Sequence, residues 1–190
     1  TTTTVADGSY AFSNVLAFQN YLVCETQPVA YGTGSANGTA GSNQIAITNL
    51  AASGSGNNNF GETPASVAGS VYQDTGAGTA ANFNNGVRDA GETGIANVPV
   101  TLTGTDTLGN PVNVTVNTDA SGNYLFGGLL PPNAAGYTLT EGAIPPAAGS
   151  FLDGRDSAGT AGGSTAVNDA VSAISLAAGV QSTGYTFGEL

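Results

Sequence analysis

The chain has 190 residues, of which 40% are hydrophobic and only 8% are charged, and its formal net charge is −11. Lysine and histidine are absent, and the only basic residues are Arg88 and Arg155. This balance excludes nucleic-acid binding and attraction to an anionic membrane surface, because both depend on clustered Lys and Arg; it permits the binding of cations.

The same composition argues against an enzyme and against a membrane span. Without His the chain lacks the usual general base and the Ser-His and Cys-His pairs, and without Lys it lacks P-loop and Schiff-base chemistry. A carboxylate pair can hydrolyse a glycoside, but the sequence singles out no such pair. No apolar run approaches the ~18 residues of a membrane span. We therefore expect a non-enzymatic protein without a membrane span.

Residues 1–64 contain three short motifs: Asp-Gly-Ser-Tyr-Ala-Phe at 7–12, Tyr-Leu-Val-Cys-Glu at 21–25 and Asn-Phe-Gly-Glu at 59–62. The second motif holds Cys24, the only cysteine, which cannot form a disulfide within the chain. Cys24 is interpreted as a buried or edge thiol of a strand. The alternatives are an intermolecular disulfide and a bridge to a missing half of the domain.

The three motifs recur in the same order in the second part of the chain, at residues 121–126, 137–141 and 186–189. Phe60 and Phe187 are 127 positions apart (187 minus 60). A fixed long period indicates tandem domains. We predict that residues 1–64 form the C-terminal half of one repeat and that residues 65–190 form a complete repeat. The junction is short and contains Pro, which limits bending.

The complete repeat is predicted to consist of short strands between turns rich in Gly, Asn, Asp and Pro. Residues 98–106 and 112–118 alternate apolar with polar side chains, which is typical of an antiparallel β-sandwich. Only residues 169–178 have a helical alternative, and their β-branched content favours a strand. The predicted strands are residues 66–74, 98–106, 112–118, 123–126, 137–141, 166–176 and 183–188.

A candidate calcium loop follows the first of these strands. Asn85, Gly86, Asp89 and Glu92 have the spacing of positions 5, 6, 9 and 12 of an EF-hand loop, in which Gly permits the turn and Glu binds the ion bidentately. Positions 1 and 3 of that frame are Ala and Phe, which offer no side-chain oxygen. The alternative is that these are ordinary turn residues.

Several segments of the chain, in the right order, resemble an SdrD B-like repeat, which belongs with the CnaB-type domains of bacterial surface proteins. These segments are residues 70–74, 84–95, 118–126, 152–156, 168–169 and 184–190. The resemblance covers the whole second domain and, less well, residues 1–62. It implies tandem Greek-key sandwiches of about seven strands of the CnaB or prealbumin type, the first one incomplete. It also implies bound calcium, a bacterial extracellular or cell-surface location and a structural role as a tandem spacer.

The resemblance adds Asp74 to the calcium loop, because a strand-end residue at this place is a ligand in the family. The insertion of residues 75–81 separates Asp74 from the rest of the loop, so Asp74 has to fold back toward it. The predicted calcium ligands of the loop are Asp74, Asn85, Asp89 and Glu92.

A second candidate calcium site consists of Asp153, Asp156 and Asp169, three carboxylates in a domain with few charges. The alternatives are that Arg155 pairs with one of them or that they cap turns. Residues 31–35 occupy the equivalent place in the first repeat and contain no Asp. Any second site is therefore not shared by both repeats.

CnaB-type domains often carry an internal Lys–Asn isopeptide bond assisted by a buried acid, and Glu25 and Glu141 occupy the place that resembles this acid. Because the chain has no lysine, a Lys–Asn bond within it is impossible. We expect Glu141 to be a strand-end carboxylate that accepts backbone N–H groups or is exposed. Calcium is expected to take the place of the covalent bond.

A sandwich that lacks its early strands exposes an apolar face and unpaired sheet edges. Residues 1–64 are therefore expected to be completed by neighbouring repeats of a longer surface protein, or by strand addition from an identical subunit, which would build a head-to-tail filament. Both interpretations give a structural stalk, rod or fibre. The alternative function is an adhesin module that binds a host or neighbouring-cell ligand, and residues 75–83 are the only candidate for its binding loop.

Overall fold

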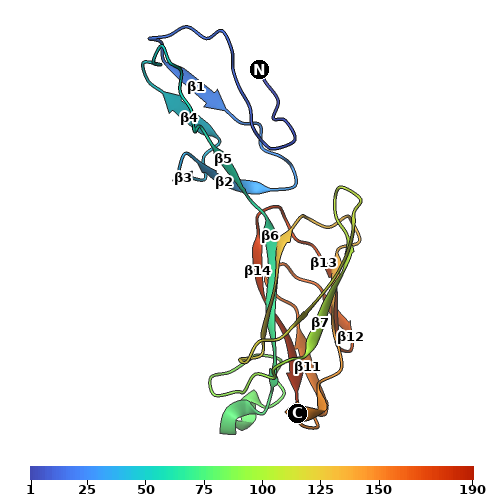
Figure 1. Cartoon of the computed structure of the whole chain (residues 1–190). Coiled ribbons are helices and arrows are strands. Elements are labelled where there is room, and N and C mark those ends of the chain that lie inside the picture. The colour runs from blue at the N-terminus through green and yellow to red at the C-terminus, as the bar shows by residue number, and fades with distance from the viewer. The chain divides into compact units, whose positions relative to one another are not determined.

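The computed structural model describes all residues from 1 to 190 and contains strands and short 3₁₀ turns but no α-helix. The chain forms two compact units, Thr1–Gln27 with Thr33–Glu62 and Pro28–Gly32 with Thr63–Leu190 (Figure 1). The N-terminal strands are β1 (Tyr21–Cys24), β2 (Gly32–Ala36), β3 (Thr39–Ala40), β4 (Gln44–Ile47) and β5 (Phe60–Thr63). The C-terminal strands are β6 (Ala65–Gln73), β7 (Pro99–Thr105), β8 (Pro111–Asn117), β9 (Asn123–Leu129), β10 (Tyr137–Glu141), β11 (Asp153–Ser157), β12 (Ser164–Val167), β13 (Ala170–Ile174) and β14 (Gln181–Glu189). The 3₁₀ turns are η1 (Gly76–Gly78), η2 (Ala80–Asn82) and η3 (Pro146–Ala148).

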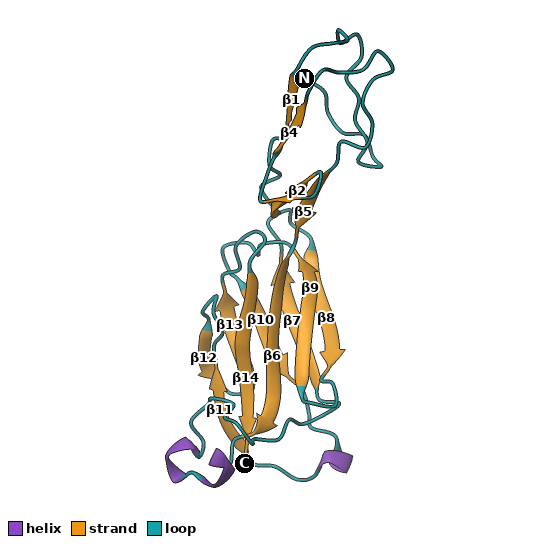
Figure 2. Cartoon of the chain, turned by 90° about the vertical axis from the view of Figure 1, so that its left-hand side faces the viewer, coloured by secondary structure: helices purple, strands orange, loops and turns teal.

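The C-terminal unit is a sandwich of two β-sheets, which confirms the predicted all-β sandwich class (Figure 2). One sheet has the strand order β12-β13-β10-β7-β8, and the other has the order β11-β14-β6-β9. Neighbouring strands run antiparallel except β6 and β14, the first and last strands of the unit, which run parallel. The last strand is therefore held in the interior of its sheet, between β11 and β6.

The β7–β8 hairpin forms where the sequence alternates apolar and polar side chains. Val100 and Leu102 of β7 are completely buried, whereas the hydroxyl of Thr101 lies on the other face, 2.8 Å from that of Thr115 on β8. This arrangement follows from the period of two residues along a strand. The two predicted strands are confirmed to within one residue at each end.

Three aromatic rings pack together in the core of the sandwich, and they come from β9 and β14, the two strands beside β6. Tyr124 lies 5.9 Å from Phe126 at 67° and 6.4 Å from Phe187 at 33°, measured between ring centroids and planes. The Tyr124 hydroxyl donates a hydrogen bond of 3.0 Å to the Tyr185 carbonyl across β6. Position 69 on β6 has to be glycine, because a Cβ there would overlap this hydroxyl and this carbonyl.

The N-terminal unit contains a similar set of rings. Tyr10 lies 6.0 Å from Phe12 at 77° and 6.2 Å from Phe60 at 35°. The Tyr10 hydroxyl donates a hydrogen bond of 2.6 Å to the Asn58 carbonyl. The strand pairs correspond too: β1 pairs with β4 as β10 pairs with β13, and β2 pairs with β5 as β11 pairs with β14. The sequence similarity between the units thus extends to their geometry.

No strand of the N-terminal unit corresponds to β6, β7 or β8. The consequence is visible at Phe12, which is 45% exposed, whereas Phe126 at the matching place is 3% exposed. In the C-terminal unit Phe126 lies on β9 opposite Val67 of β6, and residues 9–12 have no such strand beside them. Cys24 is exposed on β1, whose only partner is β4, so the edge-thiol interpretation fits and the buried one is wrong.

Two strand predictions are wrong. Residues 166–176 are not one strand, because β12 and β13 form a hairpin whose turn has Asp169 in the left-handed region at φ 54°. Strand β11 was missed, because its sequence Asp-Gly-Arg-Asp-Ser has no apolar alternation. It is an edge strand paired with β14, and backbone hydrogen bonds define it rather than side-chain burial.

The core predicts a clear contrast between two leucines. Leu102→Ala should lower the free energy of unfolding by about 2–5 kcal/mol, because it leaves a cavity at a completely buried site. Leu125→Ala, at a position that is 59% exposed on β9, should change it by about 0.5 kcal/mol or less. Chemical denaturation followed by circular dichroism measures both values. Equal effects of the two substitutions would contradict this core.

Candidate metal centre

The loop after β6 starts from a completely buried carboxylate. Asp74 is 0% exposed, and its Oδ2 accepts a hydrogen bond of 2.7 Å from the Gly86 N–H. This bond folds residues 84–86 back onto the end of β6, as the predicted calcium loop required. The second oxygen of Asp74 and the side-chain oxygen of Asn84 are both buried and have no hydrogen-bond donor. Such oxygens are suitable cation ligands.

The other predicted ligands of the loop are engaged within it. Asn85 donates its amide N–H to Asp89 Oδ2 at 2.9 Å. Glu92 is 8% exposed and accepts the N–H of Gly76 at Oε1 and the N–H of Asp89 at Oε2, each at 2.8 Å. The structure therefore brings Asn85 to Asp89 and closes the loop through Glu92, without gathering the carboxylates of Asp74, Asp89 and Glu92 into one group.

Hydroxyl groups from two strands attach this loop to the sandwich. The Gly86 carbonyl accepts hydrogen bonds from Ser157 Oγ of β11 at 2.6 Å and from Thr186 Oγ1 of β14 at 3.1 Å. Arg88 points elsewhere, since it donates to the Ser121 carbonyl at 2.8 Å and to Asn123 Oδ1 at 3.0 Å. No positive charge of the loop faces Asp74.

A second group of carboxylates lies at the ends of three strands. Glu141 ends β10, Asp169 lies in the turn before β13 and Glu189 ends β14, and their carboxylate oxygens lie within 4.8 Å of one another. Glu141 is 7% exposed and Glu189 is 5% exposed. The Glu141 N–H donates to the Asp169 carbonyl at 2.8 Å, which fixes the first two residues side by side.

Burial and mutual repulsion raise the pKa of these carboxyl groups. The pKa of Glu141 rises to about 9, first because the side chain is buried and then because Glu189 and Asp169 are negatively charged. Burial, followed by the charges of Asp153 and Asp169, raises the pKa of Glu189 to about 7. Burial and the same two charges raise the pKa of Asp156 to about 6. No basic side chain offsets these effects, so the group favours bound protons or a bound cation.

In a comparison with known protein families, the SdrD B-like domain model matches residues 65–185. The chain belongs to the SdrD B-like domain family. Members of this family are structural modules of bacterial surface proteins. No curated protein matches the chain. None of its helical segments is long and apolar enough to cross a membrane.

Within the SdrD B-like domain, the second predicted calcium set is partly assembled. Asp169 lies beside Asp153, since its pKa is raised first by burial and then by a hydrogen bond with Asp153 and the charge of that residue. Burial and then the negative charges of Asp153 and Asp169 raise the pKa of Asp156. The charge of Arg155 is not among the causes that shift the pKa of Asp156 or Asp169, so the alternative that it pairs with one of them gains no support.

The sequence pattern did not indicate Glu141 and Glu189 as members of this group. The expectation that Glu141 accepts backbone N–H groups or is exposed is wrong, because the side chain is buried and no backbone N–H donates to its oxygens. The available signal was their recurrence: Glu25 and Glu62 occupy the same two places in the first set of motifs.

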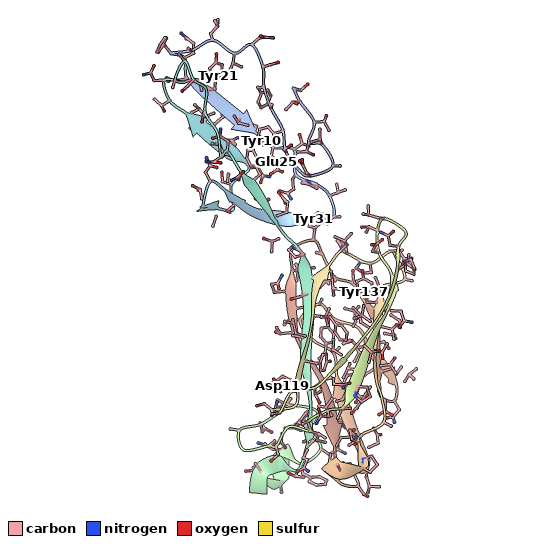
Figure 3. The ribbon with its side chains drawn as sticks, in the orientation of Figure 1. Tyr10, Tyr21, Glu25, Tyr31, Asp119 and Tyr137 are labelled. Carbon is pink, nitrogen blue, oxygen red and sulfur yellow. The ribbon has the colours of Figure 1, made fainter.

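The N-terminal unit has the same pair of acids with different neighbours. Glu25 and Glu62 lie together, and burial, followed by a hydrogen bond with Glu62 and its charge, raises the pKa of Glu25. Glu25 also lies beside Tyr10, whose pKa is raised by burial and then by this charge (Figure 3). Asn43 takes the place of Asp169, because the Glu25 N–H donates to the Asn43 carbonyl at 2.9 Å.

Amide groups contact this N-terminal pair, although Glu25 Oε2 and Glu62 Oε1 have no hydrogen-bond partner. Gln27 donates its side-chain N–H to Glu62 Oε2, and Asn43 donates to Gln27 Oε1 at 3.0 Å. The pair therefore has an amide donor where the SdrD B-like domain has a third acid.

The contacts of Glu92 predict a structural role that does not depend on metal. In the presence of a chelator, Glu92→Ala should destabilise the full chain by about 1–3 kcal/mol for each backbone N–H left without an acceptor, at Gly76 and at Asp89. Glu92→Gln should recover part of this loss, because its amide oxygen replaces one acceptor. Denaturant titration measures both variants, and an alanine variant as stable as the parent would exclude this role.

Proposed function

We propose that this chain is a non-enzymatic structural part of a bacterial extracellular or cell-surface protein, in which consecutive repeats form a calcium-stabilised rod, stalk or filament. The observation that carries the proposal is the correspondence between the two units. Each has a ring set with a tyrosine hydroxyl bonded to a backbone carbonyl, and each has a pair of glutamates, which is half-buried in the N-terminal unit and buried in the C-terminal unit. Together with the family match, this supports two repeats of one kind in series.

In this proposal residues 1–64 are the C-terminal half of an SdrD B-like repeat and residues 65–190 are a complete one. The half repeat lacks the counterparts of β6, β7 and β8. It carries large exposed apolar side chains at Val5, Phe12, Val15, Leu16, Phe18 and Leu22. Exposed apolar groups beside unpaired strand edges favour the addition of a strand from outside.

The missing strands come either from a preceding segment of a tandem array or from an identical subunit. In the second case each subunit completes the next one, and a contact of this head-to-tail kind propagates into a filament. Both cases give an extended structural element outside the cell. In both, the partner of the N-terminal unit is a strand with the pattern of β6.

Calcium is the proposed ligand of the loop formed by Asp74, Asn85, Asp89 and Glu92. It is also the proposed ligand of the group formed by Asp153, Asp156 and Asp169. The buried oxygens of Asp74 and Asn84 without donors support the first site, because calcium is bound by carboxylate, amide and carbonyl oxygens. The unbalanced negative charge around Asp169 supports the second. Calcium ions bound at the two sites would stabilise the folded state.

Calcium should raise the stability of the chain. A ligand that binds only the folded state stabilises it by about 2.7 kcal/mol at 100 times its Kd, so the melting temperature should be higher in calcium chloride than in chelator. Asp74→Asn should reduce this shift and leave the melting temperature in chelator nearly unchanged, because Asn retains an oxygen for the Gly86 N–H. Scanning calorimetry of the full chain measures both, and identical melts with and without calcium would overturn the calcium proposal.

The strand proposal predicts that a peptide with the sequence of residues 65–74 binds the N-terminal unit of the full chain. Binding should slow hydrogen exchange of the amides of residues 9–12, because β6 occupies the matching place beside β9. The matched control is the same peptide with Gly69→Ala, whose Cβ would collide with the Tyr10 hydroxyl as it would with that of Tyr124. If the two peptides bind equally, or neither binds, the strand proposal is wrong.

A further inference from the structure

Strand β8 lies at one edge of the five-stranded sheet, and no strand pairs with its outer side (Figure 2). Its pairing with β7 runs through all seven of its residues without a register shift. The backbone N–H and C=O groups along a free edge of this kind are available to a strand of another chain. The question is therefore whether β8 is protected against such pairing.

The hydrogen bonds at the two ends of the β7–β8 pair show which backbone groups are free. The Asp106 N–H donates to the Asn110 carbonyl at 3.0 Å, just before β8 begins. The Thr118 N–H donates to the Val98 carbonyl at 2.9 Å, just after β8 ends. Hydrogen-bonded pairs alternate with non-hydrogen-bonded pairs along an antiparallel ladder, so the odd-numbered residues of β8 point their backbone groups away from β7. Those with both an outward N–H and an outward C=O are Asn113, Thr115 and Asn117.

The other three edge strands of the sandwich have features that hinder pairing with another chain. Strand β11 contains Asp153, Arg155 and Asp156, and its register with β14 shifts. Strand β12 has only four residues and a register shift of its own. Strand β9 has a register shift against β6 and a glycine at position 128 with φ 70°. Charges, short strands and bulges are the usual protection of sheet edges, and residues 112–117 of β8 have none of them.

The sequence of β8 is also self-complementary. Residues 113–117 read Asn-Val-Thr-Val-Asn, which is the same in both directions. If two copies pair antiparallel about Thr115, the outward backbone groups of Asn113 meet those of Asn117 of the second copy. Val114, which is 46% exposed, then lies opposite Val116 of the second copy, and such cross-strand apolar pairs stabilise a sheet. No charged side chain opposes this pairing, because residues 111–117 contain none.

We propose that β8 pairs antiparallel with β8 of a second copy of this chain, about a two-fold axis at Thr115, so that the two five-stranded sheets become one continuous sheet. A contact of this kind uses the same surface on both chains and closes on two of them. It goes beyond the proposed function, which concerns contacts along one rod or filament, because it joins two such elements side by side. The N-terminal unit and its missing strands take no part in it.

The contact is small, because one pair of strands buries less surface than a standard protein–protein interface. The dimer should therefore form in a concentration-dependent way. The net charge of −11 on each chain adds repulsion, which salt at about 0.15 M screens in large part. The association is best measured at that ionic strength and over a wide range of protein concentrations.

Sedimentation velocity of the full chain over a concentration series measures the dimer. The principal variants are Thr115→Lys and Thr115→Asp, which place like charges opposite each other at the two-fold axis. Thr115 is exposed, so both variants should retain the pairing of β8 with β7. The matched control is Thr165→Lys, at an exposed position on β12, the opposite edge of the same sheet. Circular dichroism verifies that each variant is folded.

The parent and Thr165→Lys are expected to dimerise equally. Each Thr115 variant alone should raise the dissociation constant about tenfold or more, because like charges then lie opposite each other. An equimolar mixture of Thr115→Lys and Thr115→Asp should regain the dimer, because the two charges are then of opposite sign.

Three results would overturn the β8 contact: a parent that stays monomeric over the whole series, equal weakening in Thr165→Lys, or a mixture that does not regain the dimer. Association that persists unchanged in both Thr115 variants would overturn it too, and would point to head-to-tail strand addition instead. Strand addition to the N-terminal unit does not involve β8, so the binding of the peptide of residues 65–74 tests it separately from the β8 contact.

Discussion

The structure depends on carboxylates that are buried without a basic partner. The chain has thirteen acidic and two basic residues, so most buried acids have no ion pair available. An ionised carboxylate in a low-dielectric interior is costly unless hydrogen-bond donors, protons or metal ions compensate it. Asp74 and Glu92 use backbone N–H groups, and Glu62 uses an amide. Glu141 has no backbone or amide donor, and its raised pKa of about 9 lets it keep a proton beside Glu189.

The last strand connects the candidate sites with the fold. Successive residues of a strand point to opposite faces, so Gly188 and Glu189 separate two environments. A Cβ at position 188 would lie 3.2 Å from the Cβ of Asp74, so Gly188 leaves room for Asp74. Glu189 lies with Glu141 and Asp169. Strand β14 also pairs in parallel with β6, at the start of the repeat. Strand β14 is therefore contacted by the loop, by the carboxylate group and by β6. In a tandem array, the next repeat would be attached at the end of this strand.

The hairpin β7–β8 was predictable from the sequence, because one of its faces is buried and burial imposes alternation on the residues. Strand β11 was not, since an edge strand of polar residues is defined by its backbone pairing with β14. The fold of the loop back to Asp74 was anticipated from the resemblance, but the engagement of Asn85, Asp89 and Glu92 with each other and with backbone groups was not. Glu141 was misassigned because the sequence shows which residue ends a strand but not which acids of distant strands converge on it. The recurrence of both glutamates in the N-terminal motifs was the one signal that pointed to the pair.

Crystallography of the full chain with calcium tests the central claim most directly, through anomalous scattering at a wavelength that reveals calcium. The proposed calcium sites predict one anomalous peak at the loop of Asp74, Asn85, Asp89 and Glu92, and another at the group of Asp153, Asp156 and Asp169. Crystals grown with calcium that show neither peak would contradict it.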